Sequence, residues 1–250
     1  MTVLALHGIG FADAPAPADA PNHLRIPVGH LCAIATPTLA EVFADEIAPP
    51  LAQAQAHHAI LSAYAATQTV LPVRFGAVFS DRDAIACALR RSAPTYEAGL
   101  SALGDGVEYV VKVMAEAEGG QPAALPLPDI SLDGRAFLGR KRALRDDRRH
   151  LVQKRATFCT DLIAQLAGVS RALPLKTGAP ETLLSAALLV PRAAIPAMLA
   201  SARGCGEQAT VLGLKLALVG PGPCYAFADE VVADVGDGAE AAQSRVAAHG

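Results

Sequence analysis

The stretch Gly134–Ala167 reads GRAFLGRKRALRDDRRHLVQKRATFCTDLIAQLA, and it decides the fold class of the second half of the chain. It contains no proline and almost no glycine, so the sequence predicts one long helix. Phe137, Leu144, Leu151 and Phe158 recur every seven residues. This repeat predicts a narrow apolar seam on a helix whose remaining surface is charged.

Strand patterns flank this helix on both sides. Val107–Ala115 precedes it as an alternating apolar strand, and Arg171–Lys176 and Leu183–Val190 follow it. A second helix is predicted over Ala194–Arg203, ended by glycines, and a last strand over Gln208–Val219. The order strand, helix, strand, strand, helix, strand is the βαββαβ order of a ferredoxin-like domain.

The first half of the chain is also mixed α and β, and its order fits no single template. Strands are predicted at Thr2–His7 and Val28–Ala35, with a loop from Gly8 to Pro21 between them. The predicted helices are Leu39–Ile47, Leu51–Ala66 and one that opens at Ser80–Asp83, runs to Leu103 and is bent or split near Pro94.

These patterns predict an α+β protein of two domains. The N-terminal α+β domain is expected over residues 1–104 and the modified ferredoxin-like domain over residues 105–228. A proline-rich turn, Pro221-Gly222-Pro223, ends the regular structure. Residues 229–250 form a tail with five acidic residues and one arginine, which we expect to be loosely attached.

Composition narrows the classes of function. The 250 residues are 52% hydrophobic and 18% charged, as in a packed globular protein, and the net charge of −3 excludes a global cationic surface for nucleic acid. No stretch approaches the length of about 20 apolar residues that spans a membrane, and the run Leu183–Val190 stops after eight residues. Without a signal-peptide pattern and with five scattered cysteines, the chain is expected to be intracellular, with no membrane and no nucleic acid among its partners.

Motifs for catalysis, cofactors and metals are weak or incomplete. Gly8-Ile9-Gly10 lacks the third glycine and the helix start of a dinucleotide site, and neither a Gly-x-Ser-x-Gly elbow nor a Walker A sequence is present. The adjacent pair His57-His58 points in directions about 100° apart on a helix, which does not suit one metal. We therefore predict no enzyme, no cofactor and no metal site.

The segment Val70–Phe79, VLPVRFGAVF, is the most distinctive in the chain. Its proline places it at an edge, a bulge or an irregular end of a sheet, and its glycine permits a bulge or the close approach of another chain. It is either an edge strand with structural irregularities or an edge that pairs with a partner. On the second interpretation, the candidate partner-binding residues are Leu71, Pro72, Arg74, Phe75 and Gly76.

The helix over Gly134–Ala167 supplies the second group of candidates. From Arg135 to Arg155 there are nine Lys or Arg residues against two acids, Asp146 and Asp147. Such a run is either a solvated helix face or an electrostatic docking surface for an acidic partner. The candidates on it are Arg140, Lys141, Arg145, Arg148 and Arg149.

Several separated motifs, in order along most of the chain, resemble the GvpL/GvpF family of gas vesicle proteins. Leu71–Gly76 matches the family's Leu-Pro-Val-Arg-Phe-Gly hallmark, and Gly106–Val113 resembles its Glu-x-x-x-Lys-Val strand. Gly134–Leu138 resembles the start of its long helix, and Leu189–Pro191 and Leu218–Phe227 resemble its late Val-Pro strand and its proline-rich ending. The chain lacks the aromatic pair of the family's first strand and the tryptophan of its last turn.

The resemblance implies an accessory or minor structural protein of gas vesicles, located at the vesicle in the cytoplasm. Such a protein binds the hydrophobic shell protein, limits its aggregation while a vesicle nucleates, and contacts other vesicle proteins; it implies no catalytic activity. On this basis the edge segment is expected to cap a shell-protein edge while the Arg-rich helix docks acidic residues. The alternatives are a scaffold for other accessory proteins only, and a small-molecule enzyme or an RNA-binding module on an α+β fold.

Overall fold

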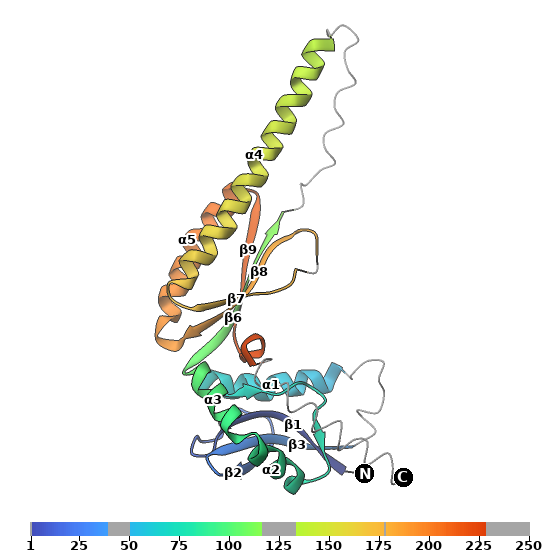
Figure 1. The fold of residues 1–250 in the computed structure, drawn as a ribbon, viewed down its shortest axis with the longest axis vertical. Coiled ribbons are helices and arrows are strands. Elements are labelled where there is room, and N and C mark those ends of the chain that lie inside the picture. The colour runs from blue at the N-terminus through green and yellow to red at the C-terminus, as the bar shows by residue number, and fades with distance from the viewer. Residues whose placement is uncertain (1, 40–50, 117–133, 178, 229–250) are drawn as a thin grey trace. The chain divides into compact units, whose positions relative to one another are not determined.

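The computed structural model describes residues 2–39, 51–116, 134–177 and 179–228 (Figure 1). Contacts divide the chain into two compact units. The first unit is built from Met1–Tyr109, Leu189–Arg192 and Gly220–Gly250, and the second from Val110–Leu188 and Ala193–Val219. The division falls inside three strands, between residues 109 and 110, 188 and 189, and 219 and 220. The predicted domain boundary between residues 104 and 105 stays a prediction.

The first unit contains an antiparallel sheet in the order β2-β3-β1-β4, with β5 also paired to β1. Its strands are β1 (Thr2–Phe11), β2 (Leu24–Val28), β3 (Leu31–Leu39), β4 (Leu71–Pro72) and β5 (Val78–Phe79). The predicted loop over Gly8–Pro21 begins only after Phe11, and the predicted strand over Val28–Ala35 is in part correct, because Leu31–Ala35 lies in β3 while Val28 ends a separate strand. Strand β1 continues to Phe11, and β2 and β3 form a hairpin whose turn contains Gly29 at a φ of 63°.

An irregularity inside β1 sets which side chains face the core. The pairing of β1 with β3 shifts between Leu6 and Gly8, so His7 occupies a bulge. Leu6 and Ile9 are three residues apart and would face opposite sides of a regular strand. Because of the bulge, both enter the same buried cluster.

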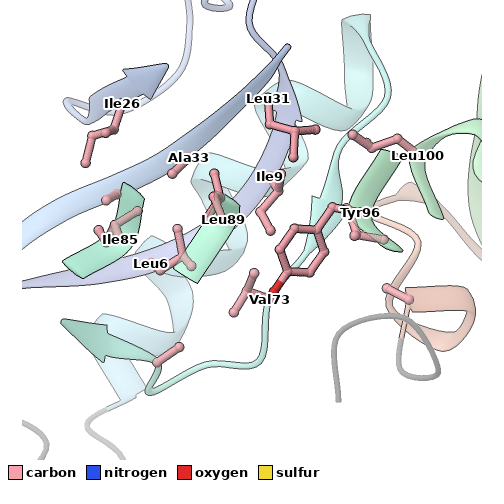
Figure 2. Packing of buried hydrophobic residues seen from close by; sticks show 14 of the residues in the cluster. Leu6, Ile9, Ile26, Leu31, Ala33, Val73, Ile85, Leu89, Tyr96 and Leu100 are labelled. Atoms are coloured by element: carbon pink, nitrogen blue, oxygen red, sulfur yellow. The ribbon is translucent and has the colours of Figure 1, made fainter. Parts of the chain in front are cut away.

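Helices cover both faces of this sheet. Helix α1 (Leu51–Thr67) packs on one face through Ile60, Leu61 and Tyr64, which contact Ile34 and Val70. Helices α2 (Arg82–Arg91) and α3 (Ala93–Leu103) belong to the larger cluster on the other face, shown in Figure 2 around Leu6, Ile9, Leu89, Tyr96 and Leu100. The predicted split of this helical stretch near Pro94 is confirmed, with Asp81 as the N-cap of α2.

The second unit contains most of a four-stranded antiparallel sheet in the order β7-β8-β6-β9, and one end each of β6, β8 and β9 belongs to the first unit. Its elements are β6 (Gly106–Ala115), α4 (Gly134–Ala167), β7 (Arg171–Pro174), β8 (Thr182–Pro191), α5 (Ile195–Val211) and β9 (Leu214–Gly222). A 3-10 turn, Arg192–Ala194, links β8 to α5. The α+β class with two sheets is confirmed.

Two predicted elements differ from the observed ones in this unit. The glycines at 204 and 206 do not end α5, which continues to Val211. Packing overrides glycine's weak helix propensity there, because Met198, Ala202, Cys205 and Ala209 continue one buried stripe past both glycines. The last strand therefore begins at Leu214 and not at residue 208.

Several predictions lie outside the described residues. They are the helix over Leu39–Ile47, the linker over residues 119–131 and the acidic tail over residues 229–250; only Leu39 is described, and it belongs to β3. Within the described ranges, none of the helices combines the length and the apolar character that a bilayer span requires.

Candidate partner-binding surfaces

The distinctive segment forms the edge of the first sheet in two pieces separated by a short excursion. Leu71 and Pro72 pair with Ile9 and Gly8, and Val78 and Phe79 pair with Ala5 and Leu4. The backbone N–H of Val73 donates to the carbonyl of His7 at 2.9 Å, and Leu6 donates to Ala77 at 2.8 Å. Residues 4–9 of β1 therefore face residues 71–73 and 77–79. Arg74, Phe75 and Gly76, here called the RFG loop, stand outside this pairing.

The RFG loop is the accessible part of the first candidate group. The side chains of Leu71 and Pro72 are buried, whereas Arg74 is exposed and Phe75 and Gly76 are partly exposed. Gly76 has a φ of 96°, a conformation that glycine adopts without strain and that turns the chain back toward the sheet. Among the described strands, β4 ends the sheet order on this side. A partner would therefore meet the RFG loop and the strand edge, not the buried pair.

Beneath the RFG loop lies a buried pair of histidines. The Phe75 ring stands edge-on to the His57 ring, with centroids 5.5 Å apart. Nδ1 of His57 lies 2.9 Å from Nδ1 of His7, and Nε2 of His7 lies 2.8 Å from the Thr36 hydroxyl. Because the two Nδ1 atoms share one proton, this hydrogen bond requires a neutral acceptor ring. The cluster joins β1, α1 and β3 directly behind the loop.

Burial keeps both histidines uncharged near neutral pH. Desolvation, followed by the charge of His57, lowers the pKa of His7 to about 3. Desolvation, followed by the charge of His58, lowers the pKa of His57 to about 4. The sequence pointed to His57 only as part of an adjacent pair on a helix. Its pairing with His7 depends on the register of β1 against α1, which local sequence patterns do not reveal.

We expect the first unit to lose stability as the pH falls from about 6.5 toward 4. In the unfolded chain both histidines take up protons near their ordinary pKa of 6.5, whereas the folded chain binds them only below about 4 and 3. The unfolded state thus binds more protons in this window, and each histidine costs up to about 1.4 kcal/mol of stability per pH unit. Urea unfolding between pH 7 and 5 measures this slope.

The matched variants are His57→Gln and, as a control, His150→Gln on the exposed part of α4. His57→Gln should flatten the pH slope of the unfolding free energy, because one of the two proton-binding differences is gone. The control should keep the wild-type slope. A wild-type protein with equal stability at pH 7 and pH 5 would contradict the buried, neutral pair.

The proline-rich ending, from Gly220 to Phe227, lies in the first unit, and its residues from Pro223 onward are buried or partly buried. Oε2 of Glu108 in β6 accepts a hydrogen bond from the N–H of Ala226 at 2.8 Å, and Cys224 joins the large core cluster. The Tyr225 ring stacks on His58 with centroids 6.0 Å apart. Burial, and then the negative charge of Glu108, raises the pKa of the Tyr225 phenol to about 12. These contacts anchor the proline-rich ending to β6, to helix α1 and to the large buried cluster of the first unit.

Arg192 is a structural residue that the sequence did not single out. Its guanidinium donates to the backbone carbonyls of Ala65, Ala66 and Gln68, the last at 3.4 Å and Ala66 at 2.9 Å. These carbonyls belong to the C-terminal end of α1, where cations are favoured by the helix dipole. Arg192 therefore fixes the end of the helix that leads directly into the distinctive segment.

The second candidate group lies on helix α4 in the second unit. Every described side chain from residue 135 to residue 150 is exposed, including Arg140, Lys141, Arg145, Arg148 and Arg149. Asp146 contacts Arg145 at 3.8 Å and the remaining basic side chains dominate this part of the helix. The RFG loop and the basic helix belong to different compact units, so each forms a candidate surface by itself.

Comparisons with known proteins agree with this architecture. The family model described as "Gas vesicle synthesis protein GvpL/GvpF" matches residues 21–229. The crystal structure of the gas vesicle protein GvpF from Anabaena superposes with a TM-score of 0.68 at 14% identity, covering 91% of this chain and 96% of that one. GvpF from Microcystis aeruginosa gives 0.66 at 14% identity, covering 90% and 98%. A search of curated proteins returns no match.

Proposed function

The chain belongs to the GvpL/GvpF family of gas vesicle synthesis proteins, and from this premise we propose that it binds the hydrophobic shell protein during vesicle nucleation and assembly and limits its aggregation. The observation that carries the proposal is the edge of the first sheet. There, β4 and β5 each pair with β1 on one side, no other described strand pairs with them, and the RFG loop lies between them.

A sheet edge suits this task for a physical reason. Subunits that assemble through strands and apolar faces aggregate through unpaired edges before assembly is complete. An exposed edge on a second protein can pair with such a strand and block its further growth. The exposed guanidinium of Arg74 beside this edge adds a charge that discourages stacking of further apolar strands.

The basic part of α4 supplies a second contact. Its nine Lys or Arg residues against two acids over residues 135–155 attract acidic side chains of a partner and speed their encounter. We propose that other gas vesicle proteins as well as the shell protein are partners. The specific alternative is a scaffold that contacts only other accessory proteins.

The proposal also covers the fold of the second unit and the non-enzymatic class of the protein. The element order β6-α4-β7-β8-α5-β9 with the strand order β7-β8-β6-β9 supports a ferredoxin-like second unit. We propose a non-enzymatic role at the gas vesicle in the cytoplasm, without a cofactor. Within the described residues no three His, Cys, Asp or Glu side chains gather in a metal-binding arrangement.

Co-expression with a gas vesicle shell protein tests the two surfaces. We expect Arg74→Ala to lower the amount of shell protein that co-purifies, and the triple reversal Arg145→Glu, Arg148→Glu and Arg149→Glu to lower it further, by about tenfold at moderate salt. Circular dichroism checks that each variant is folded. If both variants retain wild-type amounts of shell protein, these surfaces are not the binding sites.

A further inference from the structure

Helix α5 covers only the C-terminal half of α4. Sγ of Cys205 lies 3.3 Å from Oε1 of Gln165, whereas the residues just after α5, Leu212 and Gly213, accept hydrogen bonds from Arg155. The two helices are therefore antiparallel, and the cover that α5 provides ends near Arg155. Figure 1 shows α4 continuing well beyond α5.

The face that α4 buries continues into its uncovered half. Phe158, Leu162 and Leu166 are buried in the second unit. Seven and fourteen residues before Phe158, the same stripe carries Leu151 and Leu144, and Phe137 follows after another seven. Phe137 is 45% exposed and Leu144 is 58% exposed. We call Phe137, Leu144 and Leu151 the open seam.

A basic residue stands four positions after each member of the open seam. These residues are Lys141, Arg148 and Arg155. Arg155 already binds a helix of the same chain. Its guanidinium donates to the carbonyls of Leu212 at 2.9 Å and of Gly213 at 3.3 Å, at the end of the covering helix α5. Lys141 and Arg148 are exposed, and within the described part of the chain neither makes a hydrogen bond or an ion pair.

The charges decide what occupies the open seam. A second copy of this helix would place basic residues against basic residues, which is destabilising. A bilayer surface needs a broad apolar face, whereas this seam is widened only by Leu138 and Val152 among the described residues and has Lys141 and Arg148 beside it. A nucleic acid would use the cations but not the heptad-spaced Phe and Leu side chains. Only a partner that carries apolar side chains at heptad spacing together with acidic side chains contacts both the open seam and the basic residues beside it.

We propose that the exposed half of α4 pairs with an acidic amphipathic helix of a partner protein. The apolar side chains of that helix pack on the open seam, and its carboxylates meet Lys141 and Arg148. The new helix takes the position beyond the end of α5 and extends the existing helix pair. This rests on the proposed function in that the natural partner is a gas vesicle protein, but it concerns a separate surface from the RFG loop.

A synthetic peptide of about four heptads, with leucine at the seam positions and glutamate beside them, tests the inference against the full chain by fluorescence anisotropy. Lys141→Glu with Arg148→Glu should weaken binding by about tenfold or more, and Leu144→Ser by about tenfold. Arg135→Glu with Arg142→Glu is the matched control. These residues have the same spacing and charge change, lie on another face of the helix, and should change affinity by less than about threefold.

Control peptides separate the contribution of the apolar contacts from that of the charged contacts. Replacing the leucines of the peptide by serine at constant charge, or its glutamates by glutamine at constant apolarity, should each weaken binding by about tenfold. Equal binding of the serine peptide would overturn the inference in favour of unspecific attraction to anions. Tighter binding of a single-stranded RNA or of anionic vesicles, lost in the Lys141→Glu, Arg148→Glu variant, would overturn it as well.

Other occupants of the seam give distinct results. A dimer of the chain alone in sedimentation, abolished by Leu144→Ser, would show that a second copy fills the seam and would overturn the inference. Tenfold tighter peptide binding after removal of residues 229–250 would show that the chain's own acidic tail competes for the seam, and it would also overturn the inference. If the peptide binds as expected while shell protein does not co-purify, the inference stands and the shell-protein role fails. If shell protein co-purifies but the peptide does not bind, the shell-protein role stands and the inference fails.

Discussion

Replacing Leu71 by alanine is expected to lower the free energy of unfolding by about 2–5 kcal/mol. Leu71 is one of the candidate partner-binding residues, yet its side chain has 0% exposure and belongs to the large cluster of the first unit. The substitution leaves a cavity between the sheet edge and the helices of that cluster. Urea unfolding followed by circular dichroism measures the loss.

The matched comparison for Leu71 is Leu144→Ala in the open seam, where the side chain is 58% exposed. That variant should change the free energy of unfolding by less than about 0.5 kcal/mol, as expected for an exposed site. A Leu71→Ala protein as stable as the wild type, with weakened shell-protein binding, would instead show that Leu71 contacts the partner directly.

Replacing Gly220 by alanine is expected to destabilise the first unit by about 2–4 kcal/mol, through overpacking and backbone strain. A Cβ atom there would lie 2.7 Å from the backbone carbonyl oxygen of Glu108 and 2.7 Å from the Tyr109 ring. Gly220 also has a φ of 149°, which side-chain-bearing residues rarely adopt. The close approach holds the end of β9 against β6, from which Glu108 anchors Ala226.

Gly204→Ala in α5 is the control with the opposite sign. A Cβ at this helical position would meet no described atom within 4 Å beyond its chain neighbours and its own helix backbone, so alanine should stabilise the protein by about 0.5–1 kcal/mol through its better helix propensity. Thermal unfolding of both variants against the wild type gives the comparison. Equal stabilities for Gly220→Ala and the wild type would contradict the packing of the C-terminal ending on β6.

Elements with strong local signals could be predicted from the sequence. Helix α4 has the predicted bounds Gly134–Ala167, because nothing in that stretch interrupts a helix and the apolar repeat is regular. The edge position of Leu71–Phe79 was indicated by Pro72, which has no backbone N–H to donate to a neighbouring strand. In both cases the deciding physics lies within a few residues of sequence.

Elements decided by tertiary contacts could not be predicted in this way. Gly8 reads as the start of a loop, but in the structure it is part of β1 and lies so close to Leu61 that a Cβ would be 2.7 Å from its Cδ2. The RFG loop exists only because six residues of β1 pair with the residues on either side of it. The local sequence pattern of residues 70–79 predicts neither the strand that pairs with this segment nor the register of that pairing.

The candidate sites also contain some features that local sequence predicts and others that tertiary contacts decide. The exposure of the basic residues on α4 agrees with their charge density, which local sequence reveals. The burial of Leu71 and Pro72, the histidine pair behind Phe75 and the role of Arg192 depend on segments that are distant in sequence. Family resemblance identified the segment, but only the structure separates its buried residues from its accessible ones.

The most direct test of the central claim measures how much gas vesicle shell protein stays soluble and co-purifies when it is co-expressed with the wild-type chain. We expect a clear rise over expression of the shell protein alone, in a complex that dissociates as salt screens the basic helix. No rise in soluble shell protein and no complex at low salt would contradict the shell-binding role and leave the contacts of this protein to other accessory proteins.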